Sequence, residues 1–325
     1  KLDNGFKDAC DYLIAGKDHE FKNIWFSAEK YTPAGIVAGN SLYQQLKNKK
    51  KPVCLPLPWD ALQDLTYGIR RGEMWTITAG SGMGKTQVLR ELAYHIQKTT
   101  EDNIGMIFLE DTLDDSARGV MSISANKPIH IPTVEISDDE WDNAYRDTLG
   151  KNRYFFFDSF GSNDVDTIVN TIRYLALGCD CKYILLDHIS ILVSDQQQGD
   201  ERKALDEIAT KLKTLTIELD IWLGMVSHSK RPTGKSHEEG GQTSLSELRG
   251  TAGIGQLSNM VIGLERNGQD DDPYKRNVTL IRVLKNRFSG LTGPSSYLHY
   301  DRDTGRLTEV FPDMEEVEDF EEAEL

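Results

Sequence analysis

The sequence has few cysteines and no long apolar run. None of its apolar stretches approaches the roughly 20 residues that a membrane-spanning helix needs. The four cysteines, at positions 10, 54, 179 and 181, lack the paired spacing of a zinc site and the density of a disulfide scaffold. The chain is therefore expected to be intracellular, in a reducing compartment and without a membrane partner.

Excess positive charge is also missing, because 52 acidic residues outnumber 37 basic ones and the net charge is −15. Binding to nucleic acid rewards clustered lysine and arginine. However, the eight acidic residues between Asp313 and Leu325 stand without a basic one, so this segment carries −8 and leaves −7 for the rest. We expect residues 313–325 to be a disordered acidic tail. A nucleic-acid binder is not excluded, since only its contact surface must be basic.

The first 30 residues are too few to form an independent core. They combine helix-like apolar spacing at Phe6 and Cys10 with aromatic residues at Trp25 and Phe26. We interpret residues 1–30 as the tail of a preceding domain, and the chain as part of a longer protein.

A linker is predicted over residues 31–58. Thr32-Pro33 suits a helix start, because proline is favoured at the first helical position. Ile36 and Tyr43 could share one apolar face of that helix. Three prolines up to Pro58 would then replace the helix with an extended segment.

Residues 59–312 are predicted to form the main domain. Short apolar runs alternate there with longer helical segments, which is typical of an α/β fold with a mainly parallel central sheet and crossover helices. The expected strands are 74–79, 104–109, 154–157, 183–187, 221–227, 260–265 and 277–285.

A glycine-rich segment follows the first of these strands and precedes a helical run. It is a P-loop, in which Gly80, Gly82 and Gly84 let backbone N–H groups point at a phosphate. Lys85 would reach the β- and γ-phosphates, and Thr86 would offer a hydroxyl to Mg²⁺. The residues predicted to hold the nucleotide are Ala79, Gly80, Ser81, Gly82, Met83, Gly84, Lys85 and Thr86.

Two further strands end in carboxylates. Asp187 is the last residue of the predicted strand 183–187, and we expect it beside the metal at the carboxyl edge of the sheet. The neighbouring His188 should point the other way by strand alternation and make a structural hydrogen bond. Glu110 follows the strand 104–109 and could act as the base that orients the attacking water. Taken alone, Glu110 fits a charge at a helix N-terminus equally well.

His228 ends another strand and could hydrogen-bond a γ-phosphate, although a buried structural histidine is the alternative. The following loop, residues 229–243, carries Lys230, Lys235 and several glycines. Such a loop suits contact with a phosphate backbone, unless it is simply solvated.

Lys285 and Arg287 lie two residues apart on a predicted strand, so both should point to one face and Asn286 to the other. In a ring, this pair could reach a nucleotide bound by the neighbouring subunit, where an arginine finger stabilises the transition state. A surface-exposed basic strand is the alternative reading.

Together these motifs resemble one family. The segments that carry the resemblance are Gly82–Thr86, Leu109-Glu110, Leu186–Ser190, His228, Leu248–Gly250 and Leu264–Asn267. They are similar to the DnaB-type, RecA-like replicative helicases, most of all to the helicase half of phage primase-helicases and of mitochondrial Twinkle. The resemblance runs from about Trp59 to Tyr300. Because Gly5 to Lys17 also looks like the end of a primase half, the resemblance implies that residues 1–30 are the remnant of a preceding primase domain of the Toprim type.

The resemblance implies a RecA-like P-loop domain and assigns roles to individual residues. Lys85, Thr86 and Asp187 would hold nucleotide and metal, Glu110 would be the catalytic base, and His228 would sense the γ-phosphate. It further implies contacts with single-stranded DNA, catalysis in trans and nucleotide coupling. The residues concerned are Lys230, Lys235, Arg249 and Gly250 for DNA, Lys285 and Arg287 for catalysis in trans, and Gln256 for nucleotide. The sequence departs from the family pattern at two places. The loop of residues 229–243, which we call the basic loop, is one residue shorter than in the family, and Gly255 stands where a basic residue is expected.

The function implied is a ring-shaped helicase that couples hydrolysis of a nucleoside triphosphate, ATP or dTTP with Mg²⁺, to unwinding at a replication fork. The implied partners are further copies of the chain in a hexamer or heptamer, single-stranded DNA, and a DNA polymerase that binds the acidic tail.

A phage protein would act in the host cytoplasm and a Twinkle-like one in the mitochondrial matrix. The alternatives are a recombination ATPase that forms open filaments and a non-motor nucleotide switch.

Overall fold

The computed structural model describes residues 5–27, 33, 35–49, 51–159, 164–190, 198–229, 235–248 and 252–311, with no side-chain description for residues 198–202 and 252. The chain divides into two compact units, Lys1–Pro52 and Val53–Leu325. The domain boundaries predicted at residues 30, 58 and 312 remain predictions.

The first unit contains short helices. Helices α1 (Ala9–Ile14) and α2 (Asp18–Phe26) pack around the buried Tyr12, whose ring lies 4.3 Å from that of Phe6 and 5.6 Å from that of Phe21. A 3₁₀ turn, η1 (Gly39–Leu42), leads into α3 (Tyr43–Asn48).

The helix expected from Pro33 is wrong in its first part. The helical segment begins only at Gly39, and Gly35 has a φ of +89°, a left-handed conformation that does not continue a right-handed helix. Ile36 and Tyr43 are both exposed. An isolated helix this short gains little stability without packing.

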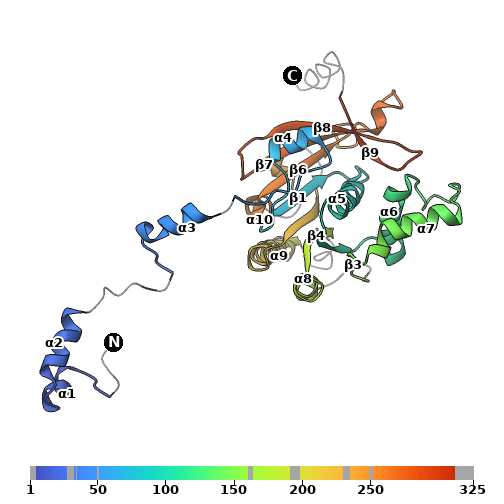
Figure 1. Ribbon diagram of the computed structural model, residues 1–325. Helices are drawn as coiled ribbons and strands as arrows, with labels where there is room; N and C mark the ends of the chain where they lie inside the picture. The colour runs from blue at the N-terminus through green and yellow to red at the C-terminus, as the bar shows by residue number, and fades with distance from the viewer. Residues whose placement is uncertain are drawn as a thin grey trace. The chain divides into compact units, whose positions relative to one another are not determined.

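The second unit is built on a nine-stranded sheet in the order β3-β2-β4-β5-β1-β6-β7-β8-β9 (Figure 1). The strands from β3 to β6 in this order run parallel, and β7, β8 and β9 are antiparallel. The strands are β1 (Met74–Ala79), β2 (Asn103–Phe108), β3 (Tyr154–Phe156), β4 (Cys181–Asp187), β5 (Trp222–His228), β6 (Met260–Glu265), β7 (Val278–Asn286), β8 (Gly293–Tyr300) and β9 (Leu307–Val310).

Helices cover both faces of this sheet (Figure 1). One core cluster joins the sheet to α4 (Asp60–Thr66) and α5 (Lys85–Thr99), and the other joins it to α8 (Val165–Leu177), α9 (Gln198–Glu218) and α10 (Ala252–Leu257). Alternation along the strands supplies the two clusters, since Leu185 belongs to the first and Leu186 to the second. Helices α6 (Leu113–Ala125) and α7 (Asp138–Asp147) share a smaller cluster. No helix in these described ranges is long and apolar enough to cross a bilayer.

The expected α/β fold with a mainly parallel sheet is confirmed, and all seven predicted strands are present within two residues of their predicted ends. Strands β8 and β9 were missed. Both carry mixed polar and apolar residues on partly exposed faces, so their apolar signal is weaker than that of the buried central strands.

An ion pair attaches the hairpin of β8 and β9 to helix α5. The carboxylate of Glu91 on α5 accepts from Arg306 Nε at 2.9 Å and from the backbone N–H of Leu307 at 2.9 Å. Glu91 is buried. The pair therefore holds β9 against α5.

We expect Glu91→Ala to lower the free energy of unfolding by about 1.5–3 kcal/mol, because it leaves Arg306 and a buried N–H without their charged acceptor. The matched control is Glu101→Ala, since Glu101 also pairs with an arginine but its side chain is 99% exposed. Urea unfolding with an unchanged m-value measures both. Equal effects in the two variants would contradict a structural role for the Glu91 pair.

Candidate functional site

Four strands of the sheet bring chemically active residues to one edge. Strands β1, β5, β4 and β2 are parallel neighbours, so their carboxyl ends lie side by side. Ala79 is in register with His228, and Phe108 with Asp187. Glu110 follows two residues after β2. The P-loop, Asp187, Glu110 and His228 therefore meet at this edge, which we call the carboxyl edge.

The P-loop leaves β1 and closes at the start of α5. Gly82 and Gly84 have φ values of +69° and +87°, conformations that favour glycine. Lys85 is 7% exposed, and its Nζ donates to the carbonyl oxygens of Gly80 at 2.6 Å and Ala79 at 3.3 Å. Burial lowers the pKa of Lys85, while the Asp187 carboxylate opposes this shift. The ammonium thus lies inside the loop where a phosphate would bind.

Gly80 also marks a close approach between the P-loop and the basic loop. A Cβ at this position would lie 2.8 Å from the Cβ of His237, which is itself buried. Only glycine leaves room for this contact. The basic loop therefore packs directly on the first turn of the P-loop.

Thr86 and Asp187 form the oxygen-rich part of the site. Thr86 Oγ1 donates to Asp187 Oδ2 at 2.5 Å, and Asp187 is 4% exposed. Burial raises the pKa of Asp187, and the hydrogen bond from Thr86 opposes that shift. A hydroxyl and a carboxylate side by side are the ligand types that Mg²⁺ prefers.

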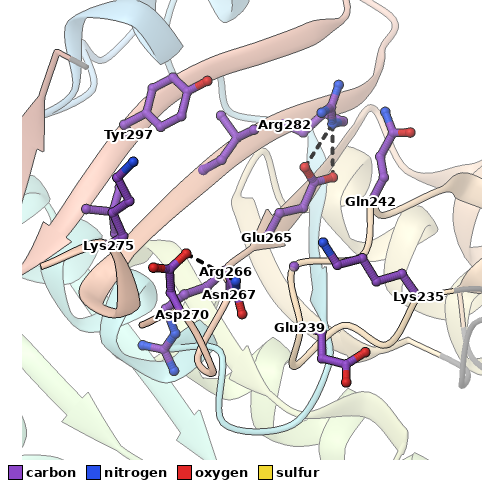
Figure 2. Close-up of a pocket in the computed structure, with 13 residues that line it drawn as sticks. Lys235, Glu239, Gln242, Glu265, Arg266, Asn267, Asp270, Lys275, Arg282 and Tyr297 are labelled. Atoms are coloured by element: carbon purple, nitrogen blue, oxygen red, sulfur yellow. Dashed lines mark hydrogen bonds and ion pairs between the residues drawn. The ribbon is translucent and has the colours of Figure 1, made fainter. Parts of the chain in front are cut away.

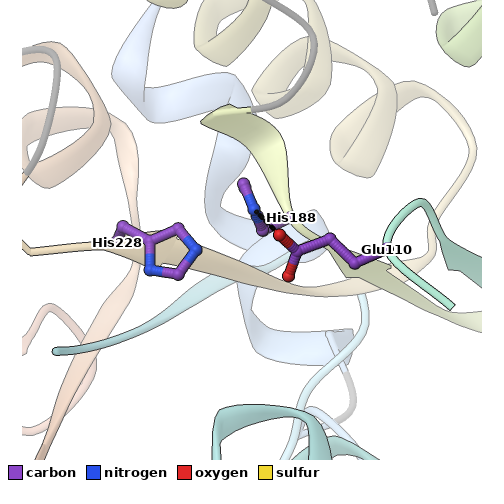
Figure 3. Close-up of side chains that lie close together, drawn as sticks. All are labelled: Glu110, His188 and His228. Carbon is purple, nitrogen blue, oxygen red and sulfur yellow. Dashed lines mark ion pairs between the residues drawn. The ribbon is translucent and has the colours of Figure 1, made fainter. Parts of the chain in front are cut away.

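Glu110, His188 and His228 form a second cluster at the carboxyl edge (Figure 3). Glu110 Oε1 lies 2.9 Å from His188 Nε2, and the two imidazole centroids are 4.2 Å apart. The expectation that His188 points away from this site is wrong. Strand β4 ends at Asp187, so strand alternation no longer sets the direction of the next side chain. The ring of His188 is directed toward the Glu110 carboxylate, and the hydrogen bond expected for His188 remains a prediction.

Lys285 and Arg287 lie at the opposite edge. Lys285 Nζ donates to the carbonyl oxygens of Gly255 at 2.5 Å and Gln256 at 2.8 Å, and Arg287 donates to the same Gln256 oxygen. Burial, followed by the Arg287 charge, lowers the pKa of Lys285 to about 8. Asn286 faces the other way and donates to the Leu65 carbonyl, so the predicted alternation is confirmed.

The backbone places this cationic pair far from the P-loop of its own chain. Arg287 N donates to Asn259 O, and the Asn259 side chain accepts from Met74 N at the start of β1. The P-loop begins at the other end of β1, a strand on the order of 20 Å long at about 3.3 Å per residue. Gln256, predicted to contact nucleotide, shares the remote edge and does not join the residues around Lys85.

A cavity of about 460 Å³ is lined by residues of β6, β7 and β8 and of the loop 235–243 (Figure 2). Arg266 lines it and donates from a guanidinium nitrogen to Gly82 O at 2.6 Å. Tyr297 on β8 contributes an aromatic ring, and Glu265 pairs with Arg282 on its wall at 2.9 Å. Sequence reasoning gave none of these residues a role. Arg266 lies in the segment Leu264–Asn267, which carries the family resemblance, but the strand that carries Tyr297 was not predicted.

The predicted DNA contacts fall mostly outside the described residues, where Lys230, Arg249 and Gly250 lie. Lys235 is described and lines the cavity. The ends of the basic loop are attached to the sheet. Ser229 Oγ lies 2.9 Å from Thr78 Oγ1, and Thr243 Oγ1 donates to Glu265 Oε1 at 2.7 Å.

Comparisons with known proteins agree on one family. The model of the DnaB-like helicase C-terminal domain matches residues 55–309. The DNA helicase/primase of Enterobacteria phage T3 is 34% identical over 310 residues, which cover 93% of this chain and 54% of that protein. The Twinkle homolog protein, chloroplastic/mitochondrial, of Arabidopsis thaliana is 23% identical over 97% of this chain and 46% of its own length. The chain spans about half the length of these curated relatives.

Solved structures support the same fold. One of them, an ATPase domain, superposes with a TM-score of 0.66 at 17% identity, covering 84% of this chain and 97% of that one. A DnaB-like replicative helicase, described with its interactions with primase, gives a TM-score of 0.67 at 16% identity and covers 93% of this chain and 73% of that one. With its P-loop and mainly parallel sheet, the chain belongs to the DnaB-like helicase C-terminal domain family.

Proposed function

We propose that the protein is the motor of a ring-shaped replicative DNA helicase, which hydrolyses a nucleoside triphosphate and uses the energy to move along single-stranded DNA. The observation that carries the proposal is the meeting of Lys85, Thr86, Asp187, Glu110 and His228 at one edge of the sheet. Membership of the DnaB-like family and the phage helicase/primase relative support it.

The residues divide the chemistry among them. Lys85 and the P-loop backbone would bind the β- and γ-phosphates, and His228 would contact the γ-phosphate. Thr86 and Asp187 would hold Mg²⁺, which when bound neutralises charge on the phosphate oxygens. Glu110 would accept the proton of the attacking water, because its side chain is 55% exposed and so reaches solvent at the carboxyl edge.

We assign the cavity beside Arg266 to the base and sugar of the nucleotide. Its volume is in the range of small-molecule sites, and the hydrogen bond from Arg266 to Gly82 attaches it to the phosphate loop. The ring of Tyr297 offers a surface on which a base could stack.

We assign Lys285 and Arg287 to the nucleotide of a neighbouring copy, since the length of β1 keeps them from their own P-loop. A ring of six or seven copies provides such an interface. The basic loop that begins at Ser229 would contact DNA through Lys230 and Lys235, with Arg249 and Gly250 on a second loop. Gln256, which accepts from Lys285 and Arg287, would relay the state of the neighbouring nucleotide. The acidic tail is proposed to recruit a DNA polymerase.

Two other functions make different predictions. A recombination ATPase would assemble as an open filament, so closed rings in electron micrographs with nucleotide would favour the helicase. A nucleotide switch would not show steady-state hydrolysis stimulated by single-stranded DNA. The family match favours the helicase over both.

We expect Glu110→Gln to retain nucleotide binding and to lose hydrolysis by about 10²–10⁴-fold, because the amide keeps the shape but not the basicity of the carboxylate. The matched control is Asp114→Asn, four residues further on, whose side chain is 73% exposed and pairs only on the surface with Arg118. Phosphate release with and without single-stranded DNA measures both. Normal turnover in Glu110→Gln would reduce Glu110 to a charge near the start of α6.

For the base site, we expect Tyr297→Ala to raise the KM for nucleotide roughly three- to tenfold, since an aromatic contact contributes about 0.5–1.5 kcal/mol beyond its area. Tyr297→Phe keeps the ring and should stay near the parent value. Hydrolysis kinetics across the common nucleotides measure both effects and reveal the preferred base. An unchanged KM for every nucleotide in Tyr297→Ala would place the base elsewhere.

Subunit mixing tests the assignment in trans. We expect Arg287→Ala to bind nucleotide but to turn over roughly a thousandfold more slowly, because it lacks the cation that stabilises the transition state next door. Mixed with Glu110→Gln, it should regain part of the hydrolysis, since some interfaces join an intact Glu110 to an intact Arg287. A labelled pull-down verifies subunit exchange. Exchanged mixtures that stay as inactive as both parents would remove the main support for Arg287 in trans.

A further inference from the structure

Glu110, His188 and His228 present three metal-ligating groups to one point (Figure 3). One ligand atom from each residue lies within 4.8 Å of the others, and the Glu110 to His188 pair is already at 2.9 Å. Around a tetrahedral zinc ion, ligand atoms about 2.0–2.1 Å from the metal lie roughly 3.3 Å from one another. Small side-chain rotations would therefore complete such a site.

The donor set selects a particular class of metal. Two imidazoles and one carboxylate suit zinc and neighbouring transition metals, whereas Mg²⁺ prefers oxygen ligands. Two histidines and a glutamate also form a ligand set known from zinc sites that keep a fourth position open. This cluster thus differs in chemistry from the Thr86 and Asp187 oxygens proposed to hold Mg²⁺.

From this geometry we propose that Glu110, His188 and His228 form a reversible Zn²⁺ site, and that occupying it stops nucleotide hydrolysis. The second part rests on the function proposed above, in which Glu110 is the base. A carboxylate bound to Zn²⁺ is a much weaker base, because the metal withdraws the electron density that would accept a proton from water. Zn²⁺ would also hold His228 away from the γ-phosphate.

The surroundings explain why the site is reversible. Binding through Nε2 leaves the proton of His188 on Nδ1, a buried atom with no partner among the described residues. Zinc-bound histidines are usually supported by an acceptor at this second nitrogen, and its loss typically costs about 10–100-fold in metal affinity. Glu110 is 55% exposed and gives the ion a path from solvent. A regulatory or inhibitory ion fits this environment better than a permanent structural one.

The test uses Co²⁺ as a spectroscopic substitute for Zn²⁺ on the whole chain without nucleotide. We expect the intense visible absorption of four-coordinate Co²⁺ at one equivalent per chain, and its removal by one equivalent of Zn²⁺. His188→Asn and Glu110→Gln should each weaken Zn²⁺ binding at least about tenfold, because each removes a ligand. His130→Asn, at an exposed histidine outside the cluster, is the control and should bind like the parent.

Inhibition is measured separately, with Mg²⁺ in excess. Zn²⁺ should abolish hydrolysis in the parent and in His130→Asn, and a zinc-selective chelator should restore it. Absence of the four-coordinate spectrum, or unchanged Zn²⁺ affinity in both ligand variants, would overturn the site. The side chain of Glu110 is exposed, so Glu110→Gln is expected to fold even if the substitution of the buried His188 prevents folding. If Co²⁺ binds as expected but Glu110→Gln hydrolyses normally, the metal site stands and the role of Glu110 as base fails.

Discussion

The burial of Lys85 is the constraint on which the arrangement of the site depends. An ammonium that is 7% exposed must be satisfied by nearby oxygens or lose its proton. The P-loop supplies the carbonyls of Ala79 and Gly80, which requires the chain to turn tightly around the amine. Asp187 and Glu110 add negative charge from two other strands. If the loop binds a phosphate as proposed, packing around Lys85 and binding of the anion would share one origin.

Contacts around this loop connect it to the more distant parts of the carboxyl edge. His237 packs against Gly80, and Arg266 donates to Gly82, so two segments that follow β5 and β6 touch the P-loop backbone directly. Glu265 then links the strand before Arg266 to Thr243 at the end of the basic loop. A change in the P-loop on binding phosphate would therefore reach the basic loop through packed atoms, without a separate relay.

Much of this arrangement could be predicted from the sequence, because the central strands are buried on both faces and their carboxyl ends carry distinctive residues. Glu110, Asp187 and His228 were found in this way, and Lys285 and Arg287 from alternation. Two results depended on tertiary structure. The direction of His188 is set beyond the end of a strand, and the cavity wall at Tyr297 belongs to a hairpin with a weak apolar signal. The prediction of a helix from Pro33 was wrong, because the apolar pattern did not account for the left-handed backbone conformation of Gly35.

The reversal of direction between β6 and β7 has a consequence for the unit of function. Because β7 runs antiparallel to its neighbour, its last residues return to the edge where β1 begins. No side-chain motion within one chain can carry Arg287 across a strand on the order of 20 Å long. If both edges serve one nucleotide, the smallest competent assembly is a pair of chains, and activity would fall with dilution even while every chain stays folded.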